Sequence, residues 1–196
     1  MTLARLAAAL QAFTPGVAPV ERIPPDHLPE AGFGLASVLV PLFEREGQVH
    51  VLLTRRPATL RLHAGQVSFP GGRVEPGERS LDAALREAQE EIGLPVERTK
   101  VLGQLSETLV LSSAFRLTPW VASVPYPYPY AAAPAEVEAI LEVPLAALEA
   151  PGAHRVEPRE VYGMPFDVHF YTAGPDVVWG ATGRVLAELL KLWRTA

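Results

Sequence analysis

The chain has no cysteine among its 196 residues, and this absence removes several kinds of chemistry at once. Without thiols, the protein cannot form disulfides, bind zinc through thiolates or use a cysteine nucleophile. The chain also lacks an apolar run near the roughly 20 residues that cross a bilayer. We therefore expect a cytoplasmic protein with no membrane partner.

Basic residues are in short supply as well. The sequence has 17 Lys and Arg against 22 Asp and Glu, which gives a net charge of −5 and a pI near 5.6. Proteins that bind nucleic acids usually present a basic face, so we expect no nucleic-acid partner. A local basic cluster can still bind a small anionic substrate.

Length and composition predict one folded domain. Apolar residues make up 48% of the chain, which is enough for a packed core. A length of 196 residues fits a single domain over residues 1–196, with an N-terminal helix and a proline-rich lead-in over residues 1–34. The sequence leaves open whether this domain is a monomer or a homodimer.

Apolar periodicity and turn residues predict strands mixed with a few helices. The expected helices span residues 2–13, 80–92 and 180–194, with a helical turn at 144–150. The expected strands span residues 36–43, 48–56, 66–72, 99–111, 115–124, 137–143 and 164–173. Ser80 should cap the second helix and Gly93 should end it. This pattern is typical of an α/β fold in which a mixed sheet carries a helix on each face.

The helix expected over residues 80–92 carries an unusual group of carboxylates. One stripe should face the core, and it consists of Leu81, Leu85, Ala88 and Ile92. A different face carries Glu87, Glu90 and Glu91, within roughly 5–6 Å of one another. Like charges at this distance repel, and the C-terminal end of a helix disfavours negative charge. Two unfavourable terms at one place indicate a function.

Two interpretations of the three glutamates remain open at this point. They form either a solvated acidic face or a site for a hard divalent cation such as Mg²⁺ or Mn²⁺, which prefers oxygen ligands. The surroundings favour the cation. Arg86 can orient one carboxylate or reach back to Glu78. Gly71 and Gly72 let the backbone approach a ligand, so a carbonyl there could complete the metal shell.

Residues 72–94, GRVEPGERSLDAALREAQEEIGL, resemble the Nudix box, G-x5-E-x7-R-E-U-x-E-E-x-G-U, where U is a bulky aliphatic residue. The matching positions are Gly72, Glu78, Arg86, Glu87, Glu90, Glu91, Gly93 and Leu94. Ala88 stands in place of U, and we expect tighter packing there. The resemblance implies a Nudix hydrolase with an α/β/α sandwich, which hydrolyses a nucleoside diphosphate linked to another moiety.

The same resemblance implies roles for individual residues. Glu87 and Glu91 would be the main ligands of Mg²⁺ or Mn²⁺, with Glu90 joining when further metals bind. The carbonyl of Gly71 would also contribute. Arg86 would lock the loop to the helix through Glu78, within the predicted catalytic site.

A further carboxylate is expected from outside the box. Glu136 lies where several Nudix enzymes supply a base or an additional metal ligand, and Glu138 is its competitor. The alternative is an exposed loop glutamate. The preceding loop, residues 125–130, carries three tyrosines. One of them could stack on adenine, whereas a plain proline-rich surface loop is the alternative.

Residues 52–72, LLTRRPATLRLHAGQVSFPGG, resemble the extra motif of the coenzyme A pyrophosphatase branch, roughly L-L-T-x-R-S-A-x3-R-x3-G-x3-F-P-G-G. Pro57 replaces the usual Ser. Four residues in this segment are candidates for phosphate binding, namely Arg55, Arg56, Arg61 and His63. Arginine binds phosphate with a planar fork. Alternatively, one or two of these arginines pair with surface carboxylates, and His63 is a structural hydrogen-bonding residue.

The branch resemblance implies that coenzyme A and water give 4′-phosphopantetheine and adenosine 3′,5′-bisphosphate. A rival within the same chemistry hydrolyses ADP-ribose, NADH or dinucleoside polyphosphates. A rival of another class is a non-catalytic module that senses a nucleotide. Loss of a metal-binding glutamate would mark such a module, and the box of this chain retains all of them.

Overall fold

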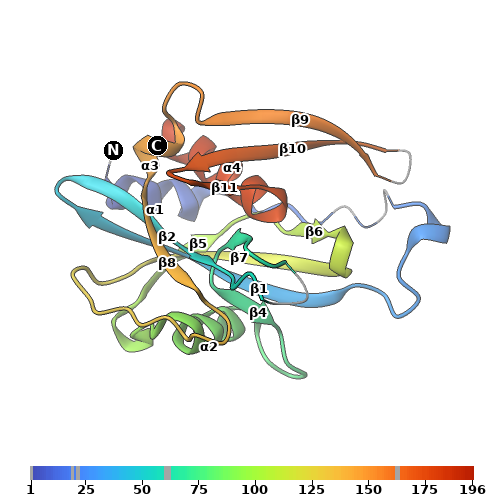
Figure 1. Ribbon diagram of the computed structural model, residues 1–196, viewed down its shortest axis with the longest axis horizontal. Coiled ribbons are helices and arrows are strands. Elements are labelled where there is room, and N and C mark those ends of the chain that lie inside the picture. Colours follow the sequence, from blue (N-terminus) through green and yellow to red (C-terminus); the bar gives the residue numbers. More distant parts are fainter. Residues whose placement is uncertain (1, 19, 21–22, 60–62, 162–163) are drawn as a thin grey trace.

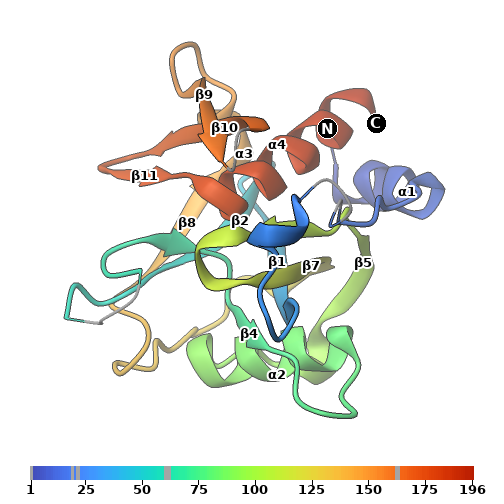
Figure 2. The same cartoon turned by 90° about the vertical axis from the view of Figure 1, so that its right-hand side faces the viewer.

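The computed structural model describes residues 2–18, 20, 23–59, 63–161 and 164–196. A large mixed sheet forms the middle layer (Figures 1 and 2). Helix α2 (Ser80–Ile92) covers one face of this sheet, and helices α1 (Leu3–Ala12) and α4 (Gly180–Thr195) cover the other. The fold is therefore the predicted α/β/α sandwich.

The middle of the sheet is the predicted hairpin of β1 (Gly34–Arg45) and β2 (Gln48–Arg55). Its turn residues Glu46 and Gly47 both have positive φ, as the twist of a two-residue hairpin favours. The strand β1 also runs parallel to β7 (Phe115–Ser123), so the sheet is mixed. The other strands of this sheet are β3 (Val67–Ser68), β4 (Gly71–Arg73), β5 (Lys100–Gln104), β6 (Thr108–Val110) and β8 (Ala139–Pro144).

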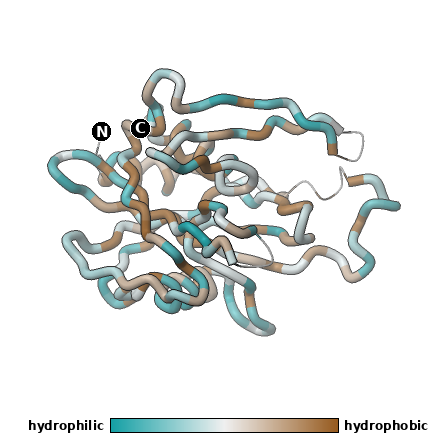
Figure 3. The backbone as a smooth tube through the Cα atoms, viewed as in Figure 1, coloured by the Kyte–Doolittle hydropathy of each residue, from teal (hydrophilic) through white to brown (hydrophobic). Residues whose placement is uncertain are grey.

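Alternation along β1 divides the core between the two faces of the sheet. Leu39 and Phe43 point into the apolar cluster beneath α2, while Val40 and Leu42 join the larger cluster on the opposite face. Helix α3 (Leu145–Leu148) packs on that opposite face with α1 and α4. Figure 3 shows apolar segments along the central strands and hydrophilic ones in the loop before α2.

A second sheet was not predicted as such. It has three antiparallel strands, β9 (His154–Val161), β10 (Met164–Ala173) and β11 (Asp176–Val178), of which only β10 was expected. The burial pattern of β9 is exposed at nearly every position, so the strand lacks the apolar alternation that reveals strands in a sequence.

Two further expectations need correction. Ser80 is the first residue of α2, not its cap; the cap is Arg79, and the Ser80 hydroxyl accepts a hydrogen bond from Trp120 Nε1. The strand expected over residues 99–111 is two strands, β5 and β6, because the chain turns out of the ladder at residues 105–107. Short 3₁₀ helices occupy Pro25–His27, Val96–Arg98 and Leu111–Ser113.

The helix predicted near the N-terminus is present as α1, and Thr2 caps it by accepting a hydrogen bond from the Arg5 N–H. Gly93 ends α2 in the left-handed conformation, as predicted. In the part of the chain that the structure describes, no helix is long and apolar enough to cross a membrane.

Candidate active site

Two glycines bring β4 up against α2. A side-chain Cβ on Gly72 would lie 2.5 Å from the carboxyl carbon of Glu87, so a larger residue would displace that carboxylate. Gly71 has φ 153°, and a Cβ there would collide with the backbone of Ser37 and Val38 in β1. Position 71 therefore requires glycine, whereas a side chain at Gly72 would shift the Glu87 carboxylate. The backbone of β4 lies directly beneath the acidic side chains of the helix.

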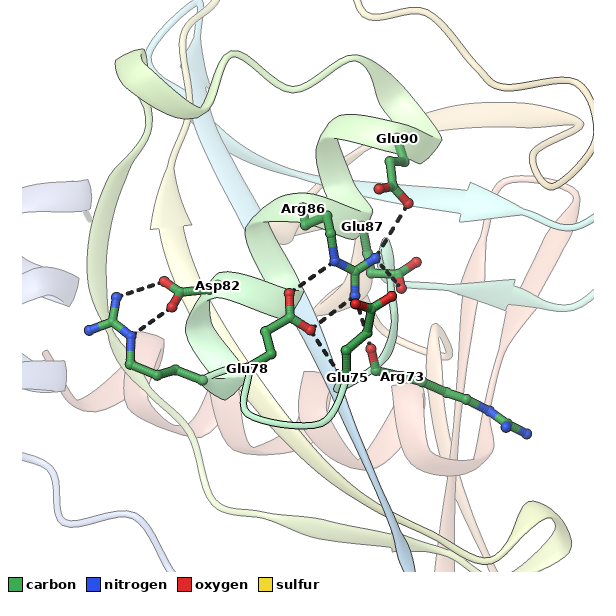
Figure 4. Close-up of polar contacts among 8 residues, drawn as sticks. Arg73, Glu75, Glu78, Asp82, Arg86, Glu87 and Glu90 are labelled. Atoms are coloured by element: carbon green, nitrogen blue, oxygen red, sulfur yellow. Dashed lines mark hydrogen bonds and ion pairs between the residues drawn. The ribbon is translucent and has the colours of Figure 1, made fainter.

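The side chain of Arg86 connects this helix to the loop before it through hydrogen bonds (Figure 4). Its Nε and Nη2 donate to the two carboxylate oxygens of Glu78 at 2.9 and 3.1 Å. Nη1 donates to Glu87 Oε1 at 2.8 Å and more weakly to Glu90 Oε2 at 3.4 Å. The hydrogen bond from Arg86 lowers the pKa of the Glu78 carboxyl. The hydrogen bonds that Arg86 donates to Glu78 and Glu87 raise the pKa of its own guanidinium. The pair keeps its charges at neutral pH.

Glu91 is not on a solvent-exposed face, contrary to the expectation that all three glutamates lie away from the core. Its exposure is 4%, while the side chains of Glu87 and Glu90 are 17% and 60% exposed. The buried surface of α2 consists of Ala83, Ala84, Ala88, Glu91 and Ile92, while Leu81 and Leu85 are half-buried. Glu91 therefore points toward the sheet.

Burial raises the pKa of Glu91 to about 7. The Gly71 N–H donates to Glu91 Oε2 at 3.2 Å and, like the charge of Arg56, opposes this rise, whereas Glu136 and Glu87 reinforce it. The protein's own cations do not fully balance the negative charge of an ionised carboxylate in this buried position. Such a group favours an added positive charge.

The donor set fits a hard divalent cation. It consists of glutamate oxygens and the backbone of Gly71, with no sulfur. Arg86 holds one oxygen of Glu87 and the Gly71 N–H holds one oxygen of Glu91; the second oxygen of each accepts no hydrogen bond from the described residues. Within the described ranges, no three acidic or histidine side chains form a ready cluster. A cation held by three carboxylates would therefore require side chains to move from the positions described here.

The predicted phosphate-binding residues separate into different environments. Arg56 lies close enough to Glu91 for its charge to lower the pKa of that carboxyl, and its Nε is buried without a hydrogen-bond partner among the described residues. Arg55 instead donates to both oxygens of Asp176 at 2.9 and 3.1 Å. Arg55 therefore pairs with carboxylates, which was the alternative to phosphate binding.

The loop after β2 holds the remaining two candidates. Arg61 lies outside the described residues. His63 is exposed, has φ 56° and bonds through Nδ1 to Gln66 Oε1 at 2.9 Å, while its carbonyl accepts the Gln66 N–H. These contacts close a local turn, so the structure gives His63 a structural contact and leaves phosphate binding there a prediction.

The loop before β8 attaches to the end of α2. The Ala133 N–H donates to the Glu91 carbonyl at 2.8 Å, and the N–H of Glu136 donates to the Ala133 carbonyl at 3.0 Å. This path brings Glu136 near enough to raise the pKa of Glu91. Its competitor Glu138 lies 3.7 Å from Arg55, on the ion-pair network that includes Asp176.

The three loop tyrosines are engaged within the protein. Tyr126 stacks on Phe43 with a centroid distance of 4.5 Å. Tyr130 donates its hydroxyl to the Pro125 carbonyl at 2.7 Å and lies against Tyr128. The guanidinium of Arg98 lies over the Tyr128 ring. These contacts favour a packed surface loop over an adenine-stacking platform.

Comparison with known proteins places this geometry in a family. The family model of the NUDIX domain matches residues 34–163. The chain belongs to the Nudix family. Nudix hydrolase NudL of Photorhabdus laumondii is 41% identical over 156 residues, which cover 79% of this chain and 82% of that protein. NudL of Cronobacter sakazakii is 43% identical over 157 residues, covering 79% and 80%.

Solved structures show the same fold at low identity. A MutT/nudix family protein from Enterococcus faecalis has a TM-score of 0.58 and 18% identity, and covers 97% of this chain and 69% of that one. RenU, a Nudix hydrolase from M. smegmatis, has a TM-score of 0.52 and 24% identity, and covers 62% and 80%. As a Nudix hydrolase, this protein is a pyrophosphohydrolase of nucleoside-diphosphate-linked substrates. Nudix hydrolases generally use divalent cations.

Sequence reasoning missed one residue of this Nudix hydrolase that bears on the site. Asp176, at the start of β11, holds Arg55, and its side chain is only 11% exposed. The two residues are 121 positions apart, so no local motif links them. This ion pair fixes the end of β2, from which Arg56 enters the acidic site.

Proposed function

We propose that this Nudix hydrolase is a divalent-metal-dependent coenzyme A diphosphatase. The oxygen of a water molecule bonds to one phosphorus of the coenzyme A pyrophosphate, and the bridging P–O bond breaks. The products are 4′-phosphopantetheine and adenosine 3′,5′-bisphosphate. Coenzyme A or one of its derivatives is the substrate, and Mg²⁺ or Mn²⁺ is the cofactor.

The observation that carries the proposal is the environment of Arg56. Its buried Nε has no hydrogen-bond partner among the described residues, beside a buried carboxylate that favours added positive charge. A buried donor without a partner is costly, so a group that supplies an acceptor is favoured there. A pyrophosphate supplies such acceptors. Arg56 also matches the arginine of the motif that resembles the coenzyme A branch.

Each residue of the site has a part in this reaction. Glu87, Glu90, Glu91 and the Gly71 carbonyl would hold the cation, which neutralises phosphate oxygens and lowers the pKa of a bound water. Arg86 positions Glu87 through its 2.8 Å hydrogen bond. We assign to Glu136, whose charge raises the pKa of Glu91, the role of accepting the proton that the attacking water loses. Arg56 binds the pyrophosphate, and Arg61 is a candidate to read the 3′-phosphate.

A substrate panel tests the proposal. Coenzyme A, 3′-dephospho-coenzyme A, ADP-ribose, NADH and diadenosine polyphosphates are incubated with Mg²⁺ or Mn²⁺, and the products are separated by chromatography. We expect coenzyme A to have the highest kcat/KM and its dephospho form a much lower one. A higher kcat/KM for ADP-ribose or NADH would refute coenzyme A as the substrate while leaving the pyrophosphatase chemistry in place. Binding without turnover of any substrate would favour a nucleotide sensor.

A further inference from the structure

A short turn over residues 133–138 joins the end of α2 to the end of β2. On the side of α2, the Ala133 N–H donates to the Glu91 carbonyl at 2.8 Å. On the side of β2, the Glu138 N–H donates to the Arg55 carbonyl, also at 2.8 Å. The turn is therefore fixed at both ends to elements that contribute residues to the acidic site.

The same turn carries Glu136. The Ala133 carbonyl accepts the N–H of Glu136 at 3.0 Å and the N–H of Val137 at 2.8 Å, so the backbone closes on itself at this point. No hydrogen bond or ion pair within the described part of the chain holds the Glu136 carboxylate. The place of this carboxylate therefore depends on the backbone of the turn.

Val137 anchors the turn. It is 2% exposed and is the one buried residue over 133–138, all of which the structure describes. Its neighbours Glu136 and Glu138 are both exposed. A buried valine fills a space of fixed shape, and its branched Cβ restricts its rotamer. The burial of this side chain thus fixes the part of the turn next to Glu136.

We propose that Val137 is a positioning residue for hydrolysis, because its buried side chain sets where the Glu136 carboxylate lies relative to Glu87 and Glu91. This inference rests on the proposed function and on the role assigned there to Glu136. A group that accepts a proton from the attacking water must lie within hydrogen-bond reach of it. A displacement of about 1 Å can lower a rate about a hundredfold.

Two substitutions at this position separate shape from stability. Val137→Ala leaves a cavity into which the turn can shift, so kcat should fall at least tenfold while KM stays within about twofold. Val137→Thr keeps the volume and the branched Cβ, although its buried hydroxyl lowers the Tm. Its kcat should stay within about threefold of the wild type. The readout is steady-state kinetics on the substrate with the highest kcat/KM in the panel above, well below the lowest Tm.

Val143→Ala is the matched control. Val143 lies in β8, is 7% exposed and belongs to the apolar cluster on the face opposite α2. The control removes the same atoms as Val137→Ala, so the Tm should fall similarly, while kcat should stay at the wild-type value. An equal loss of kcat in the two alanine variants would overturn the proposal, because destabilisation alone would then explain it.

A double-mutant cycle tests whether Val137 acts through Glu136. Glu136→Gln should lower kcat roughly a hundredfold or more. If the account is right, the double variant Glu136→Gln/Val137→Ala has the same kcat as Glu136→Gln alone. Losses that multiply would overturn the positioning role, as would full activity of Val137→Ala beside an inactive Glu136→Gln. Wild-type kcat in Glu136→Gln would instead contradict the role of Glu136 in the proposed function.

Discussion

Glu91→Gln should remove activity and at the same time stabilise the metal-free protein. Glu91 is 4% exposed, and burial raises its pKa from an ordinary value of 4.5 to about 7. In the unfolded chain the carboxyl loses its proton near the ordinary value. The folded protein therefore holds this proton more tightly, and the stability of the metal-free wild type falls as the pH rises from about 4.5 to about 7.

The size of the effect follows from the two pKa values. The difference between about 7 and 4.5, at roughly 1.4 kcal/mol per pKa unit, gives roughly 3.5 kcal/mol above neutral pH. Glutamine has the same shape and carries no charge, and its side-chain oxygen can keep the hydrogen bond from the Gly71 N–H. For a chain of this length, roughly 3.5 kcal/mol corresponds to a rise in Tm of roughly 7–14 °C.

The assay is urea denaturation in a chelator at about pH 5 and about pH 8, on either side of the titration. The two proteins should be similar at the lower pH, and Glu91→Gln should be more stable at the higher one. Added Mg²⁺ should stabilise the wild type and leave the variant unchanged. Glu90→Gln is the matched control, because the Glu90 side chain is 60% exposed, and its stability should change by less than about 0.5 kcal/mol. A variant at Glu91 that is less stable than the wild type at the higher pH would refute the reasoning.

Four other substitutions probe the site. Gly72→Ala should lower kcat at least a hundredfold with little loss of secondary structure, because the new Cβ displaces the Glu87 carboxylate; steady-state kinetics and circular dichroism measure both. Arg86→Ala should lower the free energy of unfolding by roughly 2–3 kcal/mol in urea melts, since it leaves half-buried carboxylates without their partner. Arg56→Ala should lower kcat/KM at least tenfold with the Tm nearly unchanged, whereas Arg55→Ala should mainly lower the Tm. The reverse pattern for these two arginines would contradict their assignment.

The sequence predicted the local features of the molecule well. The hairpin of β1 and β2, the helix α2 with its glycine stop and the closing helix α4 each have a periodic apolar pattern or a turn signal. The spacing of the box also predicted that Arg86 reaches Glu78, since both lie within one loop and one helix. The prediction of one domain over residues 1–196 stays a prediction.

The features that depend on distant contacts could not be read from the sequence. The depth of Glu91 depends on how α2 rotates against β4, which a helical wheel does not fix. The pairing of Arg55 with Asp176 joins two sheets, and no residue pattern near Arg55 indicates it. The strand β9 has an exposed, charged pattern and, among the described residues, pairs along one edge with β10 alone.

The most direct test of the central claim is the hydrolysis of coenzyme A in ¹⁸O-labelled water, followed by mass spectrometry of the products. The account predicts 4′-phosphopantetheine and adenosine 3′,5′-bisphosphate, with label in the phosphate of one product. It also predicts that turnover requires Mg²⁺ or Mn²⁺ and is absent in Glu91→Gln. Failure to cleave coenzyme A under conditions in which another nucleoside diphosphate derivative is cleaved, or full turnover in Glu91→Gln, would contradict it.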